Sequence, residues 1–155
     1  MIDLEIEYHA PSDIADDARY HQAVKWIADR FKLKGLTVSI SIVDDATIHR
    51  LNREHLDHDW ATDVISFVFE NEDGLIDGEI IASVDTAARL AQQAGWSTAD
   101  ELLLYVIHGL LHLAGLDDVA LEDRTAMRSA EYDCLVALAV PAANHYLQRW
   151  SSISY

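Results

Sequence analysis

The chain has 155 residues, of which 50% are hydrophobic, so one domain with a single sizeable core is expected across residues 1–155. Eleven basic residues stand against 27 acidic ones, and the net charge is −16. This excess of acid argues against DNA as a partner and against any long, non-specific contact with nucleic acid phosphates. It is compatible with a small local RNA site.

The sequence favours a cytoplasmic protein without a membrane partner. Cys134 is the single cysteine, which excludes an internal disulfide and is consistent with a reducing compartment. Residues 1–5 alternate apolar and acidic side chains and lack the basic segment of a secretory signal. The longest apolar run, residues 102–113, is shorter than the roughly 20 residues that cross a bilayer, so it is expected to form a buried helix.

The patterns along the chain predict strands interleaved with helices. Apolar and polar residues alternate at residues 2–8 and 38–42, as in strands with one buried face. Residues 63–69 and 79–84, rich in β-branched and aromatic side chains or in consecutive apolar ones, are also predicted to be strands. Five helices are predicted. The first follows residue 13 and runs up to Gly35, and the second is capped by Asp44 or Asp45 and includes His55. The other three run from a cap at Asp85 to near Gly95, from Thr98 to Ala114, and from about Leu121 to Val140. Residues after Pro141 are expected to be irregular.

A short turn at residues 71–74 joins the third and fourth predicted strands. Because other connections run through helices, the predicted fold class is α+β, a single domain with a mixed sheet. The helix from Thr98 to Ala114 is apolar on nearly every face, which places it inside the protein.

Two histidines on this buried helix form a candidate metal site. His108 and His112 lie one helical turn apart, so both imidazoles project from one face. Gly115 allows the chain to reverse after the helix, and Asp118 follows three residues later. Two imidazoles and a third ligand leave one coordination position open, as in catalytic zinc sites. Asp117 is an alternative acceptor that could orient one of the histidines.

The simpler alternative is that each histidine only satisfies a hydrogen bond in the core. Burying both on an otherwise apolar helix without a partner is costly, and an acidic turn stands where a third ligand belongs, so the metal site is favoured. The spacing is similar to that of the zinc proteases, and the helix is zincin-like. Gly109, however, occupies the position of their catalytic glutamate. A small residue there could admit a bulky group to the metal or allow close helix packing.

The segment His108-Gly-Leu-Leu-His-Leu-Ala-Gly-Leu-Asp117 resembles the signature of the YbeY family of metal-dependent endoribonucleases, which act in ribosomal RNA maturation. The resemblance covers residues 51–131 and includes further matching segments. These are Leu51-Asn52, residues 61–67, residues 78–83, Met127 and Glu131. The resemblance implies helices around a mixed four-stranded sheet.

This chain departs from the family pattern at two positions. Asp118 stands where the family usually has a third histidine, so the metal ligands carried over are His108, His112 and Asp118. Leu56 stands where the family usually has an arginine in the cleft. Arg53 and His58 are the nearest candidates to supply positive charge or a proton to a phosphate, although ordinary surface roles are the alternative for both. His58 and Asp59 could also provide an extra ligand.

The resemblance implies an enzyme that binds one Zn2+ per chain and cleaves single-stranded RNA. It also implies roles in maturation of ribosomal RNA at the 3′ end of the small subunit and in ribosome quality control. Ribosomal RNA and the small ribosomal subunit, or an assembly protein, would be its partners. The expected catalytic residues are His108, His112, Arg53 and His58. Two rival functions are a ribosome-assembly factor with a structural metal and a metal hydrolase acting on peptides or amides, with Asp117 as the base.

Overall fold

The computed structural model describes residues 1–10, 12–56, 62–141, 143 and 146. Four strands form one sheet: β1 (Ile2–Tyr8), β2 (Gly35–Val43), β3 (Val64–Glu72) and β4 (Leu75–Ser83). The helices are η1 (Ser12–Ile14), α1 (Asp17–Arg30), α2 (Asp45–Leu56), α3 (Val84–Ala94), α4 (Thr98–Leu113) and α5 (Leu121–Ala137). The fold is a single α+β domain, as predicted. Among the described helices, none combines the length and apolar character needed to cross a bilayer.

The sheet is mixed, with the strand order β1-β2-β4-β3. β1, β2 and β4 run parallel, whereas β3 pairs antiparallel with β4 and forms an edge of the sheet. The β3–β4 hairpin turns at Asp73 and Gly74, whose φ angles are 53° and 81°. Two consecutive positive φ angles are typical of a tight hairpin turn, and an Asp-Gly pair adopts them readily.

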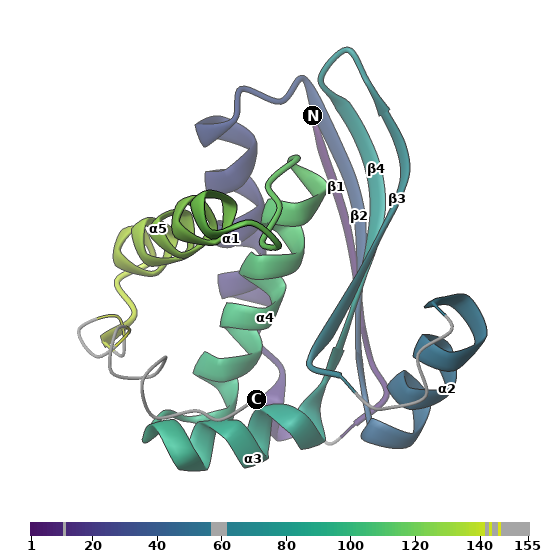
Figure 1. The fold of residues 1–155 in the computed structure, drawn as a ribbon, viewed down its shortest axis with the longest axis vertical. Coiled ribbons are helices and arrows are strands. Elements are labelled where there is room, and N and C mark those ends of the chain that lie inside the picture. Colours follow the sequence, from purple (N-terminus) through teal and green to yellow (C-terminus); the bar gives the residue numbers. More distant parts are fainter. Residues whose placement is uncertain (11, 57–61, 142, 144–145, 147–155) are drawn as a thin grey trace.

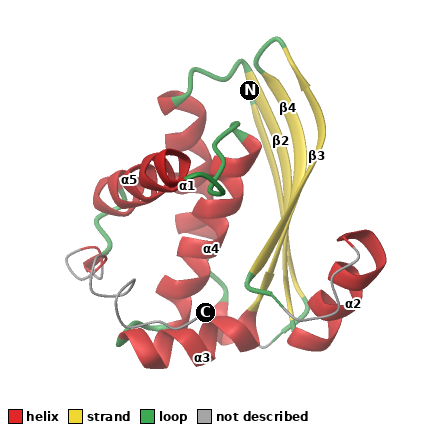
Figure 2. Ribbon diagram, in the orientation of Figure 1, coloured by secondary structure: helices red, strands yellow, loops and turns green. Residues whose placement is uncertain are grey.

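The helices lie on both faces of the sheet but unequally. Figures 1 and 2 show α4 along one face, with α1 and α5 beside it, and α2 alone at one end of the opposite face. Leu102–Ile107 of α4 are all buried, and this helix is the centre of the main core. A smaller apolar cluster of Val43, Ile48, Ile65 and Ile81 holds α2 on the other face. The expectation of a buried His-bearing helix is therefore confirmed.

Three predicted boundaries were wrong. α1 ends at Arg30 and Gly35 starts β2, because Lys32 takes a positive φ of 54° that breaks the helix. The cap of α3 is Ser83, whose hydroxyl accepts the Thr86 backbone N–H, rather than Asp85. α5 ends at Ala137 instead of Val140, since Ala139 has a φ of 57°. Trp150 lies outside the described residues.

Two glycines let α4 approach the sheet closely. A Cβ at Gly109 would lie 3.0 Å from Cγ2 of Ile80 and 3.1 Å from Oγ of Ser66. A Cβ at Gly78 of β4 would lie only 2.6 Å from Cδ2 of Leu113. The close packing of α4 that was one of the two explanations for Gly109 is therefore present.

Candidate metal centre

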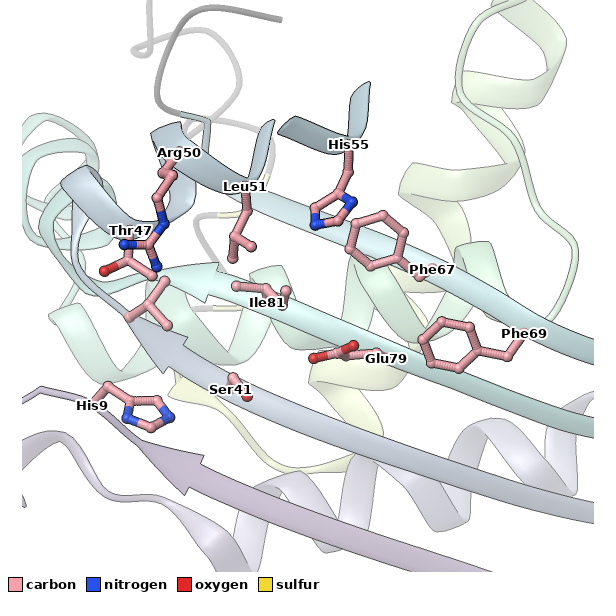
Figure 3. A pocket seen from close by; sticks show the side chains of 11 residues that line it. His9, Ser41, Thr47, Arg50, Leu51, His55, Phe67, Phe69, Glu79 and Ile81 are labelled. Carbon is pink, nitrogen blue, oxygen red and sulfur yellow. The ribbon is translucent and has the colours of Figure 1, made fainter. Parts of the chain in front are cut away.

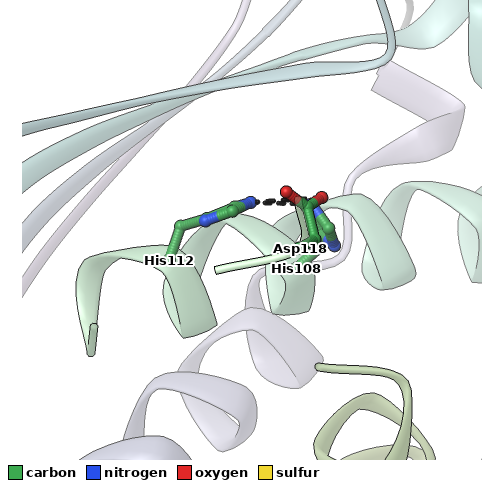
Figure 4. Close-up of side chains that lie close together, drawn as sticks. All are labelled: His108, His112 and Asp118. Carbon is green, nitrogen blue, oxygen red and sulfur yellow. Dashed lines mark hydrogen bonds and ion pairs between the residues drawn. The ribbon is translucent and has the colours of Figure 1, made fainter. Parts of the chain in front are cut away.

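His108, His112 and Asp118 converge at the C-terminal end of α4. The Nε2 atoms of the two histidines lie 3.0 Å apart, and Oδ2 of Asp118 lies 3.3 Å from Nε2 of His108 and 3.6 Å from Nε2 of His112. Figure 4 shows the three side chains pointing toward one another. Gly115, with a φ of 107°, turns the chain after the helix, and this turn returns Asp118 to the histidines.

The three ligand atoms fit a tetrahedral zinc ion. Bonds of about 2.0–2.1 Å to nitrogen or oxygen place neighbouring tetrahedral ligands about 3.3 Å apart. The three observed separations, from 3.0 to 3.6 Å, bracket this value. Within the described chain, these three residues are the His, Cys, Asp and Glu group whose ligand atoms converge in this way. The site can thus hold one divalent cation with a fourth position left for another ligand.

The other nitrogen of each histidine is held by a hydrogen-bond acceptor. Nδ1 of His108 lies 3.2 Å from Oε2 of Glu131, and Nδ1 of His112 lies 2.9 Å from the backbone oxygen of Leu116. Since both partners are acceptors, each Nδ1 carries the proton, and each Nε2 can present its lone pair to a metal. The Tyr146 hydroxyl donates to Oε1 of Glu131 at 2.7 Å, so the buried carboxylate is held on both sides.

When no cation is bound, a proton on His108 supplies positive charge to the site. Burial alone would lower the pKa of His108, but hydrogen bonds to Asp118 and Glu131 outweigh it and raise the pKa to about 10. The hydrogen bond from His108 in turn lowers the pKa of Asp118. A site that holds a proton this firmly has a strong local negative potential, which also favours a bound cation.

The three residues line a cavity of about 500 Å³ between α4, α2 and β3. Its described walls are formed by Asn52, Leu56, Thr62, Asp63, Val64, Ile65, Ser66, Val68, His108, His112 and Asp118. This set contains two carboxylates and neither lysine nor arginine. A phosphate group would therefore be repelled from the described walls unless a cation sat between the histidines.

Comparison with known proteins decides the family. Residues 5–139 match the sequence profile described as endoribonuclease YbeY. The chain belongs to the YbeY family. It is 47% identical over 112 residues to an endoribonuclease YbeY of Rhodopirellula baltica, with 70% of this chain and 58% of that protein covered. It is 34% identical over 131 residues to an endoribonuclease YbeY of Elusimicrobium minutum, with 82% of this chain and 92% of that protein covered. The match to the first relative spans less than two thirds of that relative's length.

A solved structure has the same fold. The solution structure of TM1509 from Thermotoga maritima superimposes with a TM-score of 0.63, covering 93% of this chain and 95% of that one at 23% identity. At this level of identity the likeness concerns the fold alone. The YbeY family and the mixed four-stranded sheet that the sequence predicted are both confirmed.

The structure brings together only some of the residues that were expected to form the active site. His108, His112 and Asp118 lie together. Arg53 is exposed on α2 and is not among the described residues that line the cavity, whereas Leu56 does line it. His58 and Asp59 lie outside the described residues.

Asp117 does not orient a histidine. Its Oδ1 accepts the backbone N–H of Asp118 at 2.7 Å, and Glu131 and Leu116 instead provide the acceptors for the imidazoles. The sequence patterns pointed to Glu131 only through the family resemblance and gave no sign of Tyr146. No local spacing could indicate that Glu131 of α5 would contact His108, or that Tyr146 would contact Glu131.

Proposed function

We propose that this protein is a metal-dependent endoribonuclease that cleaves single-stranded segments of ribosomal RNA. The observation that supports the proposal most directly is the convergence of Nε2 of His108, Nε2 of His112 and Oδ2 of Asp118 on the wall of an open cavity. A relative at 47% identity bears the name endoribonuclease YbeY, which is consistent with this activity. Zn2+ is the proposed cofactor, one ion per chain, because the ligand separations suit its tetrahedral site.

The proposed ligands are His108, His112 and Asp118, and the bound ion would supply Lewis acidity toward a phosphodiester. The chain's own residues hold the site in place for this task. Glu131 fixes the His108 ring, and the Leu116 backbone oxygen fixes that of His112. Asp63 and Asp118 give the cavity a negative charge, so an RNA phosphate would enter only when the cation is bound.

The proposed setting is the cytoplasm, with ribosomal RNA and the small ribosomal subunit or an assembly protein as partners. Because the net charge is −16, affinity for RNA cannot come from the overall charge of the protein. Arg53 and His58 remain proposed contributors of local positive charge. Docking on a ribosomal particle would supply affinity that the isolated chain lacks, and the proposed outcomes are 3′-end maturation of small-subunit RNA and ribosome quality control.

Cleavage of a ribosomal RNA precursor by the purified protein tests the proposal. Wild type loaded with Zn2+ is expected to cut the RNA, a chelator is expected to stop it, and His112→Ala is expected to lose at least about a hundredfold in rate, since one of three ligands is gone. His21→Ala is the matched control, because His21 is an exposed histidine on α1. It should keep the wild-type rate.

Two results would contradict this function. Cutting of casein instead of RNA would identify a peptide hydrolase. RNA left intact by the metal-loaded wild type, together with loss of ribosome association and a lower melting temperature in His112→Ala, would identify an assembly factor with a structural metal. Metal content measured by elemental analysis separates both results from a failure to load the ion.

A further inference from the structure

A second cavity, of about 520 Å³, lies on the face of the sheet opposite α4. Residues from α2, β2, β3 and β4 line it, and Figure 3 shows their side chains. The edge strand β3 divides this cavity from the metal cavity. The metal cavity is lined on this strand by Val64, Ile65, Ser66 and Val68, and the second cavity by Phe67 and Phe69. The strand thus contributes side chains to two separate concave surfaces.

The second cavity presents aromatic rings to solvent. Phe69 is 64% exposed and Phe67 is half-buried, with its ring 5.9 Å from that of His55 in an edge-on arrangement. Figure 3 shows the two rings as neighbours, and contiguous apolar side chains on a surface are typical of binding sites. Flat aromatic faces on an open sheet are the usual platform on which nucleic acid bases stack, and each stacked base contributes appreciably to binding.

The carboxylate and the guanidinium that line the cavity lie at opposite ends of it. Figure 3 shows Glu79 beside Phe69 at one end and Arg50 beside Thr47 at the other. Glu79 is half-buried, and within the described chain neither its carboxylate nor the Arg50 guanidinium forms an ion pair or a side-chain hydrogen bond. The cavity therefore offers a carboxylate and a guanidinium that both lack a charged or hydrogen-bonding side-chain partner among the described residues.

The surrounding charge fixes the direction in which an anionic ligand can lie. Beyond Phe69, the same face of the sheet carries Asp3, Glu5 and Asp77 around a neighbouring concavity. A phosphate at that end would be repelled, whereas Arg50 attracts it at the α2 end. A ligand with a planar ring bearing hydrogen-bond donors toward Glu79 and a phosphate toward Arg50 matches this charge pattern.

We infer that this cavity binds a guanine nucleotide, either free or as an unpaired residue of an RNA strand. An ionised carboxylate only accepts hydrogen bonds, and guanine alone among the four RNA bases offers two adjacent donors, N1–H and the 2-amino group. Adenine and cytosine offer one amino group beside a ring acceptor, and uracil offers one N–H between two carbonyl oxygens. Phe69 would stack on the base and Arg50 would hold the phosphate.

This site does not use the metal ligands, so the inference stands apart from the proposed nuclease function. His112→Ala and chelator treatment are expected to leave guanine nucleotide binding unchanged. Failure of RNA cleavage and failure of nucleotide binding can accordingly be told apart in the same preparations.

Calorimetric titration of the full chain with guanosine, adenosine and uridine 5′-monophosphates tests the inference. Saturable binding of the guanosine nucleotide is expected, at least about tenfold tighter than that of the other two, which is the usual discrimination of a paired carboxylate contact. A single-stranded oligouridylate with one guanosine, compared with plain oligouridylate, shows whether RNA is the source of the base. Tighter binding of the guanosine-containing strand than of the free nucleotide assigns the site to RNA, and the reverse assigns it to free nucleotide.

Two variants and one control complete the test. Glu79→Gln is expected to lose the preference for guanosine, because its amide turns a donor toward the donors of the base, and Phe69→Ala is expected to weaken all binding by about tenfold. Glu122→Gln removes the same charge from the exposed first turn of α5, on the side of the sheet that carries α4, and should bind like wild type. Melting curves confirm folding of each variant. Absent binding, equal binding of the three nucleotides, or a guanosine preference that survives Glu79→Gln overturns the inference.

Discussion

At the residue scale, the unusual feature of the proposed metal site is its third ligand, which is the carboxylate of Asp118. An oxygen ligand is harder than an imidazole, so it lowers the preference for Zn2+ over harder cations such as Mn2+. We predict that Asp118→His increases the ratio of Zn2+ to Mn2+ affinity, whereas Asp118→Ala weakens both. Competition titrations with a chromogenic chelator measure the two affinities. An unchanged ratio in Asp118→His would show that residue 118 is not a ligand.

Glu131 is the residue that orients His108 from outside the ligand set. Its side chain is 1% exposed, and its two oxygens contact the His108 ring and the Tyr146 hydroxyl. We predict that Glu131→Gln lowers metal affinity by about 10–100-fold, because partners of this kind set the tautomer and basicity of a ligand. Glu122→Gln on the exposed first turn of α5 is the matched control. Equal affinities in the two variants would exclude an orienting role.

At the scale of elements, the distance between α4 and the sheet depends on Gly78. A Cβ at this position would meet Cδ2 of Leu113 at 2.6 Å and the backbone oxygen of Phe67 at 2.7 Å. Leu113 can move, but the backbone of β3 cannot move without breaking the strand pairing. We predict that Gly78→Ala lowers the free energy of unfolding by roughly 1–3 kcal/mol, as measured by urea denaturation.

Ser39→Ala on the neighbouring strand β2 provides the comparison for Gly78→Ala. Ser39 lies on the face of the sheet that lines the neighbouring concavity, away from α4, and its substitution adds no atom. Its effect should stay within about 0.5 kcal/mol. If both variants unfold alike, the close approach of α4 is not limited by Gly78.

At the scale of the whole molecule, the proposed metal site predicts that ion binding and folding are coupled. The proposed site joins the end of α4 to the loop at Asp118 and, through Glu131, to α5, so an ion bound there stabilises only the folded chain. We predict that Zn2+ at about 100 times its dissociation constant adds roughly 2.7 kcal/mol of stability. Differential scanning calorimetry should then show an increase in melting temperature of several degrees. Zn2+ should not shift the melting temperature of His112→Ala, and an equal shift there would place the ion elsewhere.

Local patterns were sufficient for most of the fold. Alternation predicted β1 and β2, and helical spacing and caps predicted the five longer helices, because side chains repeat every two residues in a strand and every 3.6 in a helix. β3 and β4 were predicted from their apolar composition and the turn between them. The ends of elements were harder to predict. α1 and α5 are followed by Lys32 and Ala139, which adopt left-handed conformations. Lysine and alanine rarely do so, and their presence therefore did not predict where these helices end.

The sequence by itself determined the pairing of His108 with His112, since a helix brings residues four apart onto one face whatever surrounds it. It also indicated Asp118, because Gly115 permits the turn that follows the helix. Only the tertiary structure decided that Glu131 would contact His108 and Tyr146 would contact Glu131, that α4 packs closely at Gly109, and that β3 separates two cavities. These contacts join segments far apart in the chain, and their geometry follows from how the helices pack on the sheet rather than from any local repeat.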